Sequence, residues 1–572
     1  MAFVRSMLLR HAKSSTSHFL PECMASGQSS RKHLLQGRCV TREPLSASAP
    51  LFTKTPIKSS TYCDHPRRFS QSIVPKPGSD MMKKTGKLGL FLLGGALMTS
   101  LAYGNSSSPT TVFEKPLIQG ADALVRDREF DAIKEFYYDV GQYDWVAKNY
   151  STDFGKLAVQ IPRGVFRPRS EEQLLKFIAL ANKHEVKITC RGQGHTTDGQ
   201  ALCENGIVID LRELPKKLGF ANQSKNALVV SAHATWKELL DFTIQEGLTV
   251  PVLTDYLPLS VGGTLSIGGL GGSSFKKGSQ ADNVLSFRIL TFEGRILTCS
   301  KKENAELFYA ALCSLGQMGI MLDVTVSLVE SKQHAHCRSL YYRNLEQFLK
   351  DQRTLFTKGK IDHLKGYIQK KNGELYHVIE TSVFDNEPSG EHCGLYEGLS
   401  PEIIEKRDVL YKDFVHEVTH FADFLSQLNK WDVPHPWYGV LLPEDQIAEH
   451  VKMALKSPFL TGSEPVLLYP LDSELLKELF FIRPEGKKTI YLFTLLYNCS
   501  PVEDPYTDCA KIVEHNKKLY QDAVSRGGCY YLPQAMPSLE EWKRHFGKMW
   551  PVFSLMKAKY DPHHIKPLRI EK

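Results

Sequence analysis

Residues 191–200 read RGQGHTTDGQ and place His195 between glycines on a tight loop that directly follows a short apolar segment. Glycine adopts dihedral angles that other residues resist, so the backbone amides of such a loop can come close to a pyrophosphate. The histidine adds an imidazole at the same place, and polar side chains follow it. Taken alone, the loop fits a turn histidine with a solvated ring better, because short motifs are weak signals.

A second glycine-rich stretch reverses that preference. Residues 254–285 read TDYLPLSVGGTLSIGGLGGSSFKKGSQADNVL, with seven glycines among small hydroxyl residues and the carboxylate of Asp255 at the head. This composition is too flexible for a core element. The stretch contains neither G-x-x-x-x-G-K-[ST] nor a clean G-x-G-x-x-G between a strand and a helix, which speaks against a P-loop and a Rossmann turn. We interpret it as a second wall against a cofactor.

Together the two segments resemble the cytokinin dehydrogenases, a family in the flavoprotein superfamily typified by vanillyl-alcohol oxidase and p-cresol methylhydroxylase. GHTTDGQ resembles the family's GHS-x-x-GQ loop, and TDYLPLSVGGTLS is similar to its T-D-Y-L-x-L-T-V-G-G-T-L-S block. Two positions depart from the pattern: Thr196 replaces a serine, and the tail IKPLRIEK lacks the glycine and glutamine with which the family touches FAD. Further similar blocks follow in the family's order, at Ala310–Ile320, Trp431–Trp437, Pro465–Leu471, Tyr530–Gly547 and Lys557–Ile565.

The resemblance implies an FAD enzyme that removes a hydride from the carbon beside a secondary amine. The substrate would be an N6-substituted adenine, cleaved to adenine and an aldehyde, with oxygen or a quinone as electron acceptor. His195 would bond covalently to the flavin, Asp255 would accept a hydrogen bond from the substrate amine as the catalytic residue, and Trp437 would line the substrate pocket. The remaining expected FAD contacts are Gly192, Gln193, Gly194, Thr196, Gln200, Ser260, Ser266, Leu270, Ile320 and Tyr531.

Asp255 and Trp437 also have plainer interpretations. An aspartate before an aromatic residue in a loop commonly caps its own turn, and the sequence alone favours that role over a general base. Prolines stiffen the PHPW stretch, so the indole of Trp437 suits stacking on a planar heteroaromatic ligand. A half-buried interface tryptophan is about as compatible with the composition.

Helical and strand patterns alternate from Phe166 onward. Ser170 and Gln173 stand at capping-box spacing before a helix with Leu174, Leu175, Phe177, Ile178 and Ala181 on its buried side, and a strand at 186–190 then leads into the His195 loop. A second unit has a strand at 228–231, a capping box at Thr235 and Glu238, and Gly247 as a helix stop. The expected fold class is α+β, a two-subdomain PCMH-type FAD-binding domain with an α/β substrate cap.

The chain divides by composition and pattern into successive segments. A targeting presequence would occupy 1–86, a hydrophobic signal or anchor 87–104 and a linker 105–130. The FAD-binding domain would span 131–333, the substrate cap 334–527 and the C-terminal return to the FAD domain 528–572.

The first hundred residues have the composition of a targeting segment. Acidic residues are scarce up to Gly86, while Arg, Lys and Ser abound. The apolar run at 88–103 is short for a membrane span and suits a signal-peptide core or a marginal membrane anchor. Either the chain carries a two-part mitochondrial presequence, or translation starts at Met81 or Met82 and the segment is an export signal.

Composition excludes several classes of protein. With 42% hydrophobic and 23% charged residues the chain is neither disordered nor fibrous for most of its length. A net charge of +8 without a basic, aromatic-rich stripe makes nucleic-acid binding a poor interpretation. The twelve cysteines form no C-x-x-C pair, so we expect no structural zinc. The histidines of HAH at 334–336 and HH at 563–564 show neither HExxH spacing nor a third ligand nearby. We therefore expect them to be surface histidines that bind no metal.

Two other functions stay open from the sequence. A sugar, lactone or alcohol oxidase of the same superfamily would keep the FAD domain, and a Tyr or Glu from the cap would then act as base. A non-catalytic flavin- or purine-binding protein has the altered tail as its support, while the presence of both His195 and Asp255 speaks against it.

Overall fold

The computed structural model describes residues 128–569, apart from 389, 391, 461–464, 480–483, 485, 500–504, 532–535 and 537. The expected presequence, the hydrophobic segment at 87–104 and nearly all of the linker lie outside the described residues. No helix in the described part of the chain is long and apolar enough to cross a membrane.

A four-stranded sheet carries the first cofactor loop. Its order is β1-β2-β4-β3, in which β2, β4 and β3 run parallel and β1 pairs antiparallel to β2. Because β3 ends at the rim of this sheet, it releases the chain directly into the loop that holds His195. The strands are β1 (Tyr137–Asp139), β2 (Gly164–Phe166), β3 (Ile188–Arg191) and β4 (Ile207–Asp210).

Helix α7 (Glu171–Lys183) connects β2 to β3 and packs its predicted face into the core. The Oγ of Ser170 accepts from the backbone N–H of Gln173 at 3.2 Å, as expected for a helix cap. The side chain of Gln173 accepts from the N–H of Arg169 and not from that of Ser170, so half of the predicted capping box forms. Four of the five predicted core residues are buried, and Leu175 packs against them partly exposed.

The second subdomain is a five-stranded antiparallel sheet in the order β5-β6-β10-β8-β9. Its strands are β5 (Leu218–Phe220), β6 (Ala227–Ser231), β8 (Val284–Thr291), β9 (Ile296–Ser300) and β10 (Gly319–Ser327). The accompanying helices are α8 (Trp236–Thr243), α9 (Val261–Leu265), α10 (Ser274–Lys277) and α11 (Ala305–Ala311).

Helix α8 begins where the sequence predicts, and the helical turn that follows it ends at the predicted glycine. Thr235 and Glu238 form a complete capping box, with each side chain accepting from the backbone N–H of the other. Gly247 ends the helical segment in the left-handed region at φ 68°, where a side chain would be strained. The segment that leads to the glycine-rich stretch at 254–285 starts directly after this glycine.

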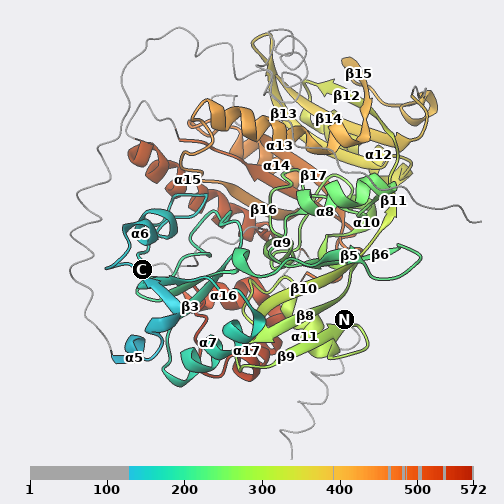
Figure 1. Ribbon diagram of the computed structural model, residues 1–572. Coiled ribbons are helices and arrows are strands. Elements are labelled where there is room, and N and C mark those ends of the chain that lie inside the picture. The colour runs from blue at the N-terminus through green and yellow to red at the C-terminus, as the bar shows by residue number, and fades with distance from the viewer. Residues whose placement is uncertain are drawn as a thin grey trace, which may run out of the picture. The chain divides into compact units, whose positions relative to one another are not determined.

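The cap is built on an eight-stranded antiparallel sheet in the order β15-β12-β14-β13-β17-β18-β16-β19. The strands are β12 (His334–Tyr342), β13 (His363–Lys371), β14 (Glu374–Asp385), β15 (Ile403–Leu410), β16 (Tyr438–Pro443), β17 (Val466–Asp472), β18 (Thr489–Leu495) and β19 (Cys529–Tyr530). The helices α12 (Leu345–Lys358), α13 (Tyr411–Gln427), α14 (Ile447–Ala454) and α15 (Pro505–Ser525) pack with it (Figure 1).

The C-terminal segment returns to the first subdomains. Figure 1 shows its helices, in red, beside β3, β8 and α11. The backbone N–H of Ile188 in β3 donates to the carbonyl of Ile565 at 2.8 Å, and that of Glu293 donates to Tyr560 at 2.9 Å. The returning helices are α16 (Leu539–Phe546) and α17 (Trp550–Tyr560). Two mixed subdomains and a cap sheet with helices make this an α+β protein, as predicted.

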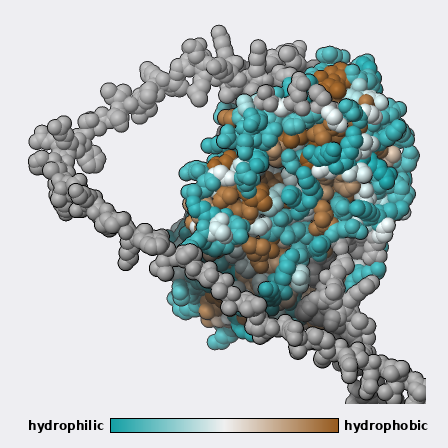
Figure 2. Space-filling view, turned by 90° about the vertical axis from the view of Figure 1, so that its right-hand side faces the viewer, coloured by the Kyte–Doolittle hydropathy of each residue, from teal (hydrophilic) through white to brown (hydrophobic). Residues whose placement is uncertain are grey.

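Smaller elements complete the chain. The helices α5 (Arg128–Asp131) and α6 (Asp144–Tyr150) begin it, and β7 (Leu248–Thr249) pairs with β11 (Val329–Glu330) where the chain leaves the flavin subdomains. A disulfide bond joins Cys499 to Cys509 in α15. On the face shown in Figure 2, several hydrophobic patches lie among hydrophilic residues.

Candidate active site

The loop after β3 is fastened by a buried carboxylate. Asp153 accepts from the hydroxyl of Thr196 at 2.6 Å and from the backbone N–H of Gly199 at 2.5 Å. Burial raises the pKa of Asp153 to about 6. Gly194 has φ 68°, and a Cβ there would lie 2.5 Å from the guanidinium of Arg191, so the tight turn requires glycine. The hydrogen bonds of Asp153 therefore fix the conformation of the predicted glycine loop.

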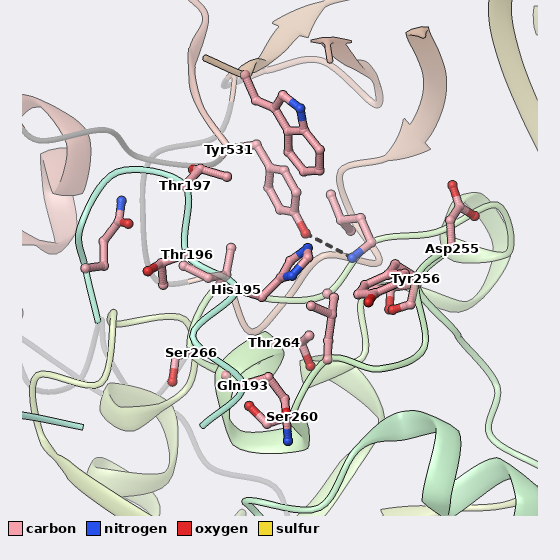
Figure 3. A pocket seen from close by; sticks show the side chains of 18 of the residues that line it. Gln193, His195, Thr196, Thr197, Asp255, Tyr256, Ser260, Thr264, Ser266 and Tyr531 are labelled. Atoms are coloured by element: carbon pink, nitrogen blue, oxygen red, sulfur yellow. Dashed lines mark hydrogen bonds between the residues drawn. The ribbon is translucent and has the colours of Figure 1, made fainter. Parts of the chain in front are cut away.

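His195 lies in a stack of aromatic rings. Its ring centroid is 3.8 Å from that of Phe154 with 19° between the planes, and 4.9 Å from that of Tyr256 at 24°. Burial, and secondly the neighbouring His435, lowers the pKa of His195 to about 3. The imidazole is therefore neutral at physiological pH, and the stack fixes its plane. Figure 3 shows this ring between the glycine-rich segment and Tyr531.

The glycine-rich stretch forms the facing wall, as interpreted from the sequence. A Cβ on Gly192 would lie 2.5 Å from the Oγ of Ser260, so the loop and the wall approach as closely as glycine permits. The backbone N–H of Leu270 donates to the hydroxyl of Tyr531 at 3.0 Å, the dashed line in Figure 3. Three segments that are far apart in the sequence thus close around one space.

Asp255 is part of a half-buried polar cluster with residues of the cap sheet. Its Oδ1 lies 2.7 Å from the Nζ of Lys365 on β13, and its Oδ2 accepts from the hydroxyl of Tyr469 on β17 at 2.8 Å. Burial acts to raise the pKa of Asp255, but the Lys365 ammonium and the hydrogen bonds outweigh it and hold the pKa below its usual value. Burial acts to lower the pKa of Lys365, and Asp255 outweighs it in turn. Asp255 is therefore ionised and bonded to cap side chains.

One cavity of about 800 Å³ joins these features. Trp431 and Trp437 line it from the cap side, and Figure 3 shows Asp255 at one side of the space around His195. The structure places every residue predicted for the site on this cavity: Gly192, Gln193, Gly194, His195, Thr196, Gln200, Asp255, Ser260, Ser266, Leu270, Ile320, Trp437 and Tyr531.

Four site residues were missed by sequence reasoning. Lys365 and Tyr469 hold Asp255, while Phe154 and Trp431 stack around His195. Trp431 stands in the WDVPHPW block and carried a signal that was not used. Tyr469 likewise stands in the block at Pro465–Leu471, whereas Lys365 and Phe154 lie in ordinary strand and loop sequence and become visible when distant segments are brought together.

The residues on the cavity fit FAD. The Nε2 of His233 is buried without a hydrogen-bond partner, so a polar ligand atom can satisfy it. Lys566 is buried, lines the same cavity and donates to the hydroxyl of Thr189, which leaves a cation on the wall for an anionic ligand. A cavity of this size, with glycine-rich backbone on two sides, suits a dinucleotide.

Two family models and several curated proteins match this chain. A family model described as "FAD binding domain" matches residues 162–300, and one described as "Cytokinin dehydrogenase 1, FAD and cytokinin binding" matches 398–567. Cytokinin dehydrogenase 3 of Arabidopsis thaliana is 30% identical over 73% of this chain and 86% of its own. The chain belongs to the cytokinin dehydrogenase family.

Other relatives show similar matches. Cytokinin dehydrogenase 7 of Oryza sativa subsp. japonica is 28% identical over 73% of this chain and 87% of its own length. An uncharacterized oxidoreductase from the fasciation locus of Rhodococcoides fascians is 30% identical over 72% of this chain and 94% of its own. As a member of the cytokinin dehydrogenase family, the protein is an FAD-dependent oxidoreductase that acts on the CH–NH group of its donors.

Proposed function

We propose that this chain oxidises the side chain of N6-substituted adenines, and that Asp255 is the catalytic residue. The observation that carries the proposal is an ionised carboxylate on the wall of the cavity that His195 also lines. Cytokinin-type substrates carry a secondary amine beside the carbon that is oxidised, so they offer an N–H to that carboxylate. Both family models cover segments of this cavity, which supports the assignment.

Asp255 would bind the substrate amine and take its proton. A carboxylate offers about four lone-pair sites, of which Lys365 and Tyr469 occupy one each. An N–H of the substrate can therefore bind without displacing either neighbour. When bound, FAD supplies the acceptor for the hydride that leaves the carbon beside the amine. The proton on nitrogen passes to Asp255, and water then hydrolyses the imine to adenine and an aldehyde.

Trp437 and Trp431 would hold the adenine ring. Their indoles lie on the cap side of the cavity, and Tyr256 lies 5.5 Å from Trp431 between ring centroids. A planar heteroaromatic ligand stacks favourably on such surfaces. We assign the FAD-binding role to 131–333 and 528–572 and the substrate-binding role to the cap at 334–527.

We further propose that His195 bonds covalently to the flavin. The neutral imidazole has a free lone pair, and its stack with Phe154 and Tyr256 fixes the direction of the ring. Acid precipitation should leave the flavin on the wild-type protein and release it from His195→Ala. His435→Gln is the matched control, because His435 stacks on the other face of Phe154. Release of flavin from the wild type would contradict the covalent bond.

The reaction is tested by anaerobic mixing of the full-length protein with N6-isopentenyladenine. We expect the visible flavin band to bleach, and Asp255→Asn to slow bleaching by about 10²–10⁴-fold, the usual contribution of a general base. Asp445→Asn serves as a control, because that carboxylate is exposed and pairs with Lys487. A flavin band that stays unchanged with this substrate but bleaches with a sugar or an alcohol would refute the adenine assignment.

Electron acceptor and destination belong to the same proposal. We propose oxygen or a quinone as acceptor, distinguished by oxygen uptake of the reduced protein with and without added quinone.

For the localisation we favour export over a mitochondrial membrane, because disulfides such as Cys499–Cys509 persist in oxidising compartments. Fractionation of cells that express the full-length chain checks this, and recovery with mitochondria would contradict it.

A further inference from the structure

Three potential ligands meet at one edge of the cap sheet, away from the flavin cavity. His336 lies on β12, Asp385 is the last residue of β14, and His392 lies in the segment that leads to β15 (Figure 1). The ligand atoms of these three side chains all lie within 4.8 Å of one another. None of the three lines the cavity of the active site. We propose that they bind one divalent transition-metal ion, most suitably zinc.

The distances suit a tetrahedral ion. Zinc bonds of about 2.0–2.1 Å place two ligand atoms about 3.3 Å apart and two bound imidazole centroids about 5 Å apart. Asp385 Oδ1 lies 2.9 Å from His336 Nε2, and Asp385 Oδ2 lies 3.5 Å from His392 Nε2. The two imidazole centroids are 5.5 Å apart. Small side-chain adjustments therefore complete three of the four positions, and two nitrogens with one carboxylate are a donor set that zinc accepts.

The surroundings orient the first histidine for a metal. His336 Nδ1 lies 2.8 Å from the carboxylate of Asp408, while its Nε2 faces Asp385. Arg338 holds Asp408 in turn at 3.1 Å. A carboxylate on the outer ring nitrogen is the usual partner of a zinc-bound histidine, because it fixes the tautomer and the plane of the ring.

The second histidine has a ring nitrogen that makes no hydrogen bond, although the Oδ2 of Asp385 lies 3.5 Å from it. The Nε2 of His392 is buried and makes no hydrogen bond. Gly390 packs against both rings: a Cβ there would lie 2.5 Å from this Nε2 and 3.2 Å from the Cδ2 of His336. A metal ion satisfies the nitrogen, and glycine is what lets the segment come close enough. The fourth position is open to water or to the carbonyl of Glu387, 3.1 Å from His336 Nε2.

The burial of His336 corrects an expectation from the sequence. HAH at 334–336 was interpreted as surface histidines without a third ligand, yet the side chain of His336 has 0% exposure. The partners come from Asp385 across the strand pair and from a loop beyond it, so no local spacing announces them. The ion would fasten the segment between β14 and β15 to the sheet and stabilise the cap without touching the flavin.

The test uses the full-length holoenzyme after chelator treatment and dialysis. Zinc uptake is followed by competition with a chromophoric chelator, and Co²⁺ is followed by its visible absorption. We expect one Zn²⁺ per chain and a tetrahedral Co²⁺ spectrum. His392→Ala should abolish both, and Asp408→Asn should weaken zinc binding by about 10–100-fold, as for other outer partners of metal-bound histidines.

Control and contrary results follow from the same geometry. His334→Ala removes a neighbouring imidazole, 6.3 Å from that of His336, and should bind zinc like the wild type. Chelation should lower the melting temperature of the wild type but not of His392→Ala, and flavin reduction should stay unchanged in both. If the wild type takes up zinc no better than His392→Ala, the proposal is wrong and a protonated His336 bridges Asp385 and Asp408 without a metal.

Discussion

Replacing Lys365 by methionine tests how Asp255 is kept ionised. Methionine has a similar volume but no charge, and it leaves the hydrogen bond from Tyr469 in place. Without the ammonium, burial dominates and the pKa of Asp255 rises above its usual value. Flavin reduction by substrate should then fall as the pH drops through this raised pKa. In the wild type the lowered pKa keeps the rate independent of Asp255 titration at neutral and mildly acidic pH.

The size of the stability effect follows from the contact. The side chain of Lys365 is 13% exposed and that of Asp255 is 27% exposed. The Nζ of Lys365 lies 2.7 Å from the Oδ1 of Asp255. Unit charges about 4 Å apart at an effective dielectric constant of about 20 attract by about 4 kcal/mol. Removing one partner of a buried ion pair costs about 3–5 kcal/mol, which agrees. We therefore expect Lys365→Met to lose about 4 kcal/mol of unfolding free energy at neutral pH.

The stability lost in Lys365→Met should be smaller at low pH than at high pH. In the variant the folded-state pKa of Asp255 lies above the unfolded one, so the stability lost by ionising the buried carboxylate disappears at low pH. Denaturant unfolding of wild type and variant at about pH 5 and about pH 8 measures this difference. Tyr469→Phe is the control, since it removes one hydrogen bond but keeps the ion pair. A Lys365→Met protein whose bleaching rate and stability loss are both the same at the two pH values would refute the reasoning.

Three further changes have defined outcomes. The folded-state pKa of Asp153 is raised to about 6, so the wild type should lose about 3 kcal/mol of unfolding free energy as the pH rises from about 4 to about 6. Asp153→Asn should remove this pH dependence, and an unchanged pH dependence in denaturant unfolding would contradict the assignment. Thr235→Ala breaks the capping box with Glu238 and should cost about 1 kcal/mol in the same assay, whereas a neutral result would mean that the box adds nothing. Tyr531→Phe leaves the N–H of Leu270 without its partner, which should cost about 1–3 kcal/mol of unfolding free energy in the same assay; an unchanged unfolding free energy would contradict a role in shaping the wall.

Local patterns predicted the elements that carry the cofactor loops. The strand expected at 186–190 is observed at Ile188–Arg191, and the one expected at 228–231 at Ala227–Ser231. Capping residues and a helix-stop glycine act within a few residues of themselves, so the sequence contains their signal. The capping box at Ser170 formed halfway, because the amide of Gln173 reaches the N–H of Arg169 instead.

The surroundings of Asp255 could not be predicted in that way. Tyr469 is 214 residues away in the sequence, and it reaches Asp255 through the register of the cap sheet. Strand β12 is buried on both faces, so it lacks the alternation that would have shown which side of the sheet His336 takes. Long-range register depends on the packing of whole layers, and one sequence does not contain it in any local pattern.

The return of the C-terminal segment to β3 bears on how the protein is made. Lys187 and Thr189 contact His564 and Lys566, 377 residues further along the chain. At about 5–20 residues per second, a ribosome needs about 20–75 s to produce that stretch. During this time β3 and the His195 loop lack their last neighbours, while the complete cap is synthesised. The cofactor cavity is thus finished last, because Tyr531 and Lys566, which line it, belong to the returning segment.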